Sequence, residues 1–147
     1  CGPYTVQKYI SKISGPLLDR IDIHIEVTPV EFNELTDTRK SEKSEVVRSR
    51  VINARKIQEQ RFKRNPNIHA NAHMRAKNIQ EICIIDEGGK KLLKKAMERL
   101  NLSARAYDRI LKVARTIADL EESVEIQNEH LAEAIQFRNL DRENWTG

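Results

Sequence analysis

The most regular segment of the sequence is LSARAYDRILKVARTIADL, residues 102–120, and IQNEHLAEAIQFR, residues 126–138, follows it closely. Apolar side chains in the first segment recur every three or four residues, which is the period of an amphipathic α-helix. They are Ala106, Ile110, Val113, Ile117 and Leu120, with a second stripe of Tyr107, Leu111, Ala114 and Ala118 beside them. We therefore expect a helix that is buried over a wide face, as the middle member of a small helical bundle would be.

One cation in this segment opposes the local electrostatics. Ser103 is expected to cap the helix, because its hydroxyl can accept from the free amides of the first turn. Arg105 then falls within that turn, where the helix dipole is positive and a cation costs about 0.3–1 kcal/mol. Two interpretations follow: the guanidinium extends into water, or Arg105 and the helix start together bind an anion such as phosphate.

Composition limits the fold class and the compartment. The chain has 147 residues, of which 39% are hydrophobic, 33% charged and 5% aromatic, and this favours one helical domain or a small domain with an arm over a β-sandwich or barrel. A net charge of +4 is compatible with an anionic partner without requiring one. Cys1 and Cys83 are far apart and indicate no disulfide framework, so we expect a reducing, cytoplasmic setting. No apolar run is long enough to span a membrane.

A single β-strand is predicted in the first part of the chain. Residues 21–27, IDIHIEV, alternate apolar side chains with Asp22, His24 and Glu26. A strand must share its backbone hydrogen bonds with a neighbour, and the sequence offers no second strand. We therefore expect a mainly α-helical bundle with an N-terminal arm that carries one leftover strand, and the start at Cys1 instead of methionine also suggests an excised fragment.

A long basic helix is expected at residues 41–62. Between residues 39 and 64, ten cations stand against three carboxylates, a net charge of +7. A basic helix face can follow a nucleic-acid backbone through counterion release. The candidate contacts are Arg48, Arg55, Lys56 and Arg61. The alternative is a solvated surface helix, which is what runs of charge usually form.

The second half of the chain is expected to be a compact helical unit. Asp86 is predicted to cap a helix over residues 87–100, with its lysines pointing outward. A boundary at residues 82–86 then separates residues 1–82 from a helical domain at 83–140, followed by a frayed tail at 141–147. His69 and His73 have metal-ligand spacing, but the string HANAH lacks the glutamate of a metalloprotease helix, so we expect no metal site.

Two motifs resemble a known family. The stretch SGPLLDRIDIHIEV, residues 14–27, resembles the end of the AAA+ core in magnesium-chelatase-like ATPases of the ComM (YifB) type. Residues 102–120, followed by HLAEAI at 130–135, resemble the C-terminal lid of these ATPases. The resemblance covers nearly the whole chain and implies the last part of a AAA+ core joined to its helical lid.

The resemblance also implies roles for two arginines. The LLDR motif supplies an arginine finger to the nucleotide of the next subunit in that family, and this role would fall on Arg20. The SAR motif at the start of a lid helix resembles sensor 2, which reaches ATP phosphate, and this role would fall on Arg105. The resemblance thus favours the anion-binding interpretation of Arg105. It implies ATP and Mg²⁺ as cofactors of a parent ATPase, a ring of copies (a hexamer) and DNA as the remodelled partner.

Several parts of such an ATPase lie outside this sequence. It contains no Walker-type phosphate loop, Walker B acid or sensor 1, so we expect the chain alone to need no cofactor and to be inactive. Cys1 resembles the last member of a cysteine cluster, and one ligand cannot build a tetrahedral zinc site. Two other functions stay open: a stand-alone nucleic-acid-binding module that uses residues 90–99 and 105–115, and a structural interaction domain.

Overall fold

The computed structural model describes residues 4, 5, 8, 12–25, 27, 41–65 and 67–138. The described elements are α2 (Gly15–Leu18), α4 (Ser44–Phe62), the 3-10 turn η1 (Asn71–His73), α5 (Ala76–Ile82), α6 (Glu87–Arg99), α7 (Ala104–Leu120) and α8 (Asn128–Gln136). The expected mainly α-helical fold is confirmed. The predicted tail at 141–147 lies outside the described residues.

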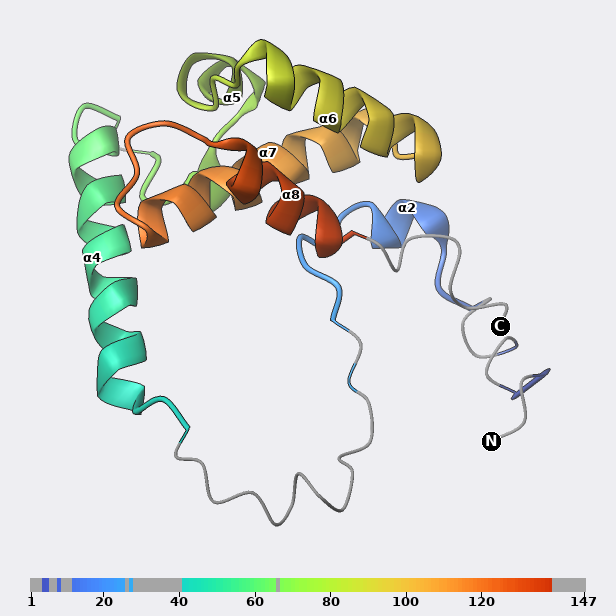
Figure 1. Ribbon diagram of the computed structural model, residues 1–147, viewed down its shortest axis with the longest axis horizontal. Helices are drawn as coiled ribbons and strands as arrows, with labels where there is room; N and C mark the ends of the chain where they lie inside the picture. Colours follow the sequence, from blue (N-terminus) through green and yellow to red (C-terminus); the bar gives the residue numbers. More distant parts are fainter. Residues whose placement is uncertain are drawn as a thin grey trace.

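Helix α7 occupies the centre of the bundle, as its two apolar stripes predict. It packs against α8, α4, η1 and α5, whereas α6 packs on α8. Figure 1 shows α7 crossing the middle of the molecule, with α5 and α6 along one side and α4 meeting it at one end. Four alanines of α7 and α8 permit this close approach, because they are almost completely buried and carry only a methyl group: Ala106, Ala114, Ala118 and Ala134.

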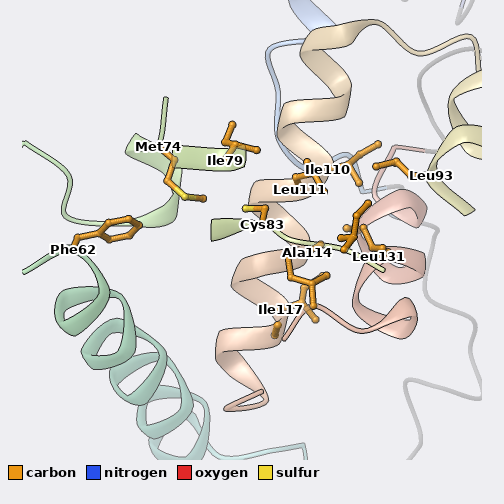
Figure 2. Packing of buried hydrophobic residues seen from close by; sticks show 14 residues of the cluster. Phe62, Met74, Ile79, Cys83, Leu93, Ile110, Leu111, Ala114, Ile117 and Leu131 are labelled. Atoms are coloured by element: carbon orange, nitrogen blue, oxygen red, sulfur yellow. The ribbon is translucent and has the colours of Figure 1, made fainter. Parts of the chain in front are cut away.

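One apolar cluster joins the helices (Figure 2). Its largest members come from α4, α6, α7, α8 and the connection around α5, and include Phe62, Met74, Ile79, Leu93, Ile110 and Leu131. Each large side chain of this kind stabilises the fold by about 1.5–3 kcal/mol when fully buried. Phe62 and Ile79 share this cluster with Leu93, Ile110 and Leu131, so residues on both sides of position 83 contribute to one core.

Local side-chain caps set where the helices begin. The Ser103 hydroxyl accepts from the amide of Ala106 at 3.3 Å, and an Asp86 carboxylate oxygen accepts from the amide of Gly89 at 2.6 Å. Both predicted caps are therefore confirmed. His130 provides a third, because its Nδ1 accepts from the Gln127 amide at 2.9 Å and so fixes the start of α8.

The structure does not show the predicted strand in the described residues 21–25 and 27. The His24 amide donates to the carbonyl of Phe137 at 2.9 Å, and Arg138 donates to the carbonyls of Leu18 and Ile21. The segment is therefore an arm that lies along the end of α8. The physical reason is that a strand needs a second strand for its backbone groups, and here a helix terminus and a guanidinium bind them instead.

Candidate nucleotide and nucleic-acid contact sites

Arg105 lies in the first turn of α7, directly after the Ser103 cap. Its side chain is exposed, and among the described residues no hydrogen bond or ion pair holds the guanidinium. The remaining amides of the same turn have no carbonyl within the helix to bind. The helix start thus presents a free cation beside backbone donors, an arrangement that can bind an anion.

An ion pair connects the arm to α7 one turn further along. Arg109 Nη1 donates to Asp22 Oδ1 at 2.8 Å, and the two side chains are 32% and 42% exposed. Arg20 precedes Asp22 by two residues and comes two residues after the end of the short helix α2. Its side chain is exposed. The structure therefore anchors the segment that carries Arg20 one helical turn from Arg105.

Lys112 continues this cationic side of α7. Its Nζ donates to the carbonyl of Ala72 at 2.9 Å and so connects α7 to η1. Burial, followed by repulsion from Arg109, lowers the pKa of Lys112 below its ordinary value. Of the three cations on this side, Arg109 and Lys112 thus have internal partners, whereas Arg105 is left to solvent.

A buried polar network, which the sequence pattern does not predict, lies at the other end of α7. Asp119 is completely buried and forms ion pairs with Arg61 of α4 and Arg115 of its own helix. Asn71 Nδ2 also donates to Asp119 Oδ2 at 2.8 Å. Arg115 donates onward to the carbonyls of Ser123 and Val124, at 2.6 and 2.9 Å. The network therefore joins α4, η1, α7 and the turn that leads to α8.

Arg61 differs from the other predicted nucleic-acid contacts in its surroundings. Its side chain is only 19% exposed, and Nη1 donates to Asn71 at 3.0 Å and to Asp119 at 2.7 Å. A guanidinium with these partners fastens α4 to the bundle and is not displayed to a partner. Arg48, Arg55 and Lys56 are exposed on α4.

The N-terminal half of α4 extends beyond the bundle (Figure 1). Only Ala54, Gln58 and Phe62 of this helix are buried, and all three lie in its C-terminal half. Every residue from 44 to 52 is exposed, including four apolar residues. These are Val46, Val47, Val51 and Ile52, with 39–49% of their surface exposed. The candidate contacts Arg48 and Arg55 therefore lie on a helix that a large partner can reach.

The donor set fits phosphate better than a metal ion. No group of three or more histidine, cysteine or acidic side chains converges among the described residues. His69 and His73 pack edge to face, with ring centroids 6.1 Å apart. The guanidinium groups of Arg20 and Arg105 suit ATP phosphates, whereas the described residues supply no carboxylate cage for Mg²⁺. None of the described helices combines the length and the apolar character needed to cross a lipid bilayer.

Comparison with protein families gives matches along most of the chain. Residues 41–138 match the C-terminal region of the magnesium chelatase subunit ChlI, and residues 1–35 match the model of magnesium chelatase subunit ChlI. Competence protein ComM of Haemophilus influenzae is 40% identical over 141 residues, 95% of this chain. The uncharacterized protein YifB of Salmonella typhimurium is 37% identical over 143 residues, 97% of the chain. The chain spans 27% of the length of either relative.

Proposed function

Because the chain belongs to the family of the magnesium chelatase ChlI C-terminal region, we propose that it is the lid-bearing C-terminal part of a AAA+ ATPase of the ComM type. ATP hydrolysis in a ring of such subunits would drive remodelling of DNA. The observation that carries the proposal is the exposed guanidinium of Arg105 at the capped start of α7, with the Arg20 segment anchored one turn away.

Both arginines would act on phosphate charge. ATP supplies the γ-phosphoryl group that is transferred to water, and such transfers are catalysed largely by positioning and by cations around the phosphoryl oxygens. Arg105 would bind phosphate through its planar fork of donors, supported by the free amides of the first turn of α7. Arg20 would supply its guanidinium to the nucleotide of a neighbouring subunit, so that hydrolysis depends on assembly.

Substitution of the two arginines in the complete ATPase tests the proposal. Arg20→Ala and Arg105→Ala should each reduce ATP turnover by at least about 10³-fold, the lower end for a lost arginine finger. Arg64→Ala is the matched control, because Arg64 is also exposed but lies two residues after the end of α4. Circular dichroism should show unchanged folding in all three variants. Normal turnover in either Arg20→Ala or Arg105→Ala would refute the proposal.

The DNA part of the proposal depends on α4. Arg48, Arg55 and Lys56 are exposed on this helix, so a phosphate backbone can contact them without unfolding the core. A stand-alone nucleic-acid-binding module is the second candidate. It would use the cationic faces at residues 90–99 and 105–115, and it needs no arginine near a nucleotide. The two differ in one measurement: the module predicts that Arg20→Ala and Arg105→Ala leave the ATP turnover of the complete protein unchanged.

A further inference from the structure

The outer surface of α6 carries two rows of cations that differ in their partners. In the first row, Lys90 pairs with Glu87 at 2.6 Å, and Lys94 lies 3.9 Å from Glu98. Each lysine of this row thus faces a carboxylate of its own helix, which offsets its charge. Hydrogen bonding to Glu87 accordingly raises the pKa of Lys90.

The second row consists of Lys91, Lys95 and Arg99. All three side chains are exposed, and among the described residues none has an ion pair or a hydrogen bond. Residues four apart lie on the same side of a helix and are separated by about 6 Å along its axis. The row therefore places three positive charges that form no ion pair in a line about 12 Å long.

We propose that this row binds the sugar–phosphate backbone of a nucleic acid, as a second contact separate from α4. The inference rests on the proposed function in taking nucleic acid as the partner. A line of cations with no internal carboxylates suits a polyanion, because each phosphate contact releases a condensed counterion. The row lies on a helix that packs on α8, whereas α4 packs on α7, so the two basic surfaces belong to different parts of the bundle.

The surroundings of the row disfavour a protein partner. The centres of protein–protein interfaces are depleted in lysine and enriched in aromatic and other large apolar side chains. No large apolar residue of α6 is exposed in the described structure: Leu92 and Met97 are half-buried and Leu93 is fully buried. The row thus offers charge without an apolar anchor, which is typical of contacts to phosphate.

Two lysine pairs of the same helix provide a matched comparison. We suggest measuring the affinity of the 147-residue chain for a fluorescent single-stranded oligonucleotide by anisotropy at several salt concentrations. Lys91→Gln/Lys95→Gln should lower the slope of log K against log salt by about 1.4, and the affinity by roughly tenfold or more, since about 0.7 is lost per phosphate contact. Lys90→Gln/Lys94→Gln removes the same charge at the same spacing and should lower the slope by less than about 0.5.

Each alternative result has a defined meaning. Equal losses from the two lysine pairs would show a general charge effect and overturn the inference. Displacement of the oligonucleotide by polyglutamate of equal charge and at equal affinity would overturn it in favour of an acidic protein. Loss of binding in Arg48→Gln/Arg55→Gln alone would also overturn it, while leaving the proposed function intact. Failure of the proposed function is read separately, from ATP turnover in Arg20→Ala and Arg105→Ala.

Discussion

Arg61 of α4 and Asp119 of α7 form an ion pair in which the carboxylate has no exposed surface. Arg115 shares the same carboxylate, with Nε 3.1 Å from Oδ1. Two cations therefore depend on one acid for their compensation. Because Phe62 is the only large apolar side chain that α4 buries fully within the described structure, this pair carries much of the attachment of the basic helix.

Loss of the buried carboxylate should strongly destabilise the fold. In Asp119→Ala, the guanidinium groups of Arg61 and Arg115 stay in the interior without their acid, and breaking a buried pair in this way typically costs about 3–5 kcal/mol. Urea unfolding followed by circular dichroism measures the change. Glu81→Ala is the control, since this exposed acid of α5 should alter the free energy of unfolding by less than about 0.5 kcal/mol. A loss below about 1 kcal/mol in Asp119→Ala would contradict the role given to the network.

Two adjacent glycines of α6 should respond differently to alanine. A Cβ at Gly89 would lie 2.7 Å from Cδ1 of Leu131, a side chain that is 1% exposed, so Gly89→Ala should overpack the α6–α8 contact and cost about 1–3 kcal/mol. A Cβ at Gly88 would lie 3.2 Å from the side chain of Asn128, which is exposed and can move. Gly88→Ala should therefore be neutral or stabilise by up to about 1 kcal/mol. Thermal unfolding of both variants measures this difference. Equal melting temperatures would contradict the close contact between Gly89 and Leu131.

Features that depend on nearby residues were predictable from the sequence. The helix α7 follows from the spacing of its apolar residues. Its cap follows from the Ser103 hydroxyl, which lies three residues before the Ala106 amide. The cap at Asp86 follows in the same way. The strand predicted at residues 21–27 is a different case. Alternating apolar residues identify a segment that is able to pair as a strand, whereas the pairing itself depends on another part of the chain.

The polar network was missed for a related reason. Arg115 and Asp119 are four residues apart, and this spacing is typical of an exposed ion pair on a helix surface. Burial of Asp119 depends on Arg61 and Asn71, which come from segments far away in the sequence. The only local signal was a carboxylate next to Ala118 of the second apolar stripe, and that signal alone does not identify a partner.

The thiol of Cys83 should be inert in the native chain. Burial raises its pKa from the ordinary 9.0 to about 11, so the reactive thiolate is scarce at pH 8. In a Cys1→Ser background, a disulfide reagent should modify Cys83 only after unfolding by guanidinium. Rapid modification of the folded chain at pH 8 would contradict the buried position.

The same shift predicts a dependence of stability on pH. Above pH 9.0 the unfolded chain loses the Cys83 proton, whereas the folded chain keeps it up to about pH 11. The free energy of unfolding should therefore fall between these values, by about 1–3 kcal/mol from this group. Cys83→Ala is the reference, since the other titrating groups remain in it. Parallel pH profiles for the two chains would contradict the prediction.

The ion pair between Asp22 and Arg109 should hold the arm locally without contributing much to global stability. Its side chains are 42% and 32% exposed, and partly exposed pairs usually contribute about 0.2–1 kcal/mol. A double-mutant cycle of Asp22→Asn and Arg109→Gln should give a coupling energy in this range that vanishes in 1 M salt, where the Debye length is about 3 Å.

Hydrogen exchange should show the local effect, because the His24 amide, bound to the Phe137 carbonyl, should exchange faster in Arg109→Gln. Lys77→Gln, an exposed change on α5, should leave that exchange rate unchanged. Equal rates for the wild-type chain and Arg109→Gln would show that the ion pair is not needed to hold the arm.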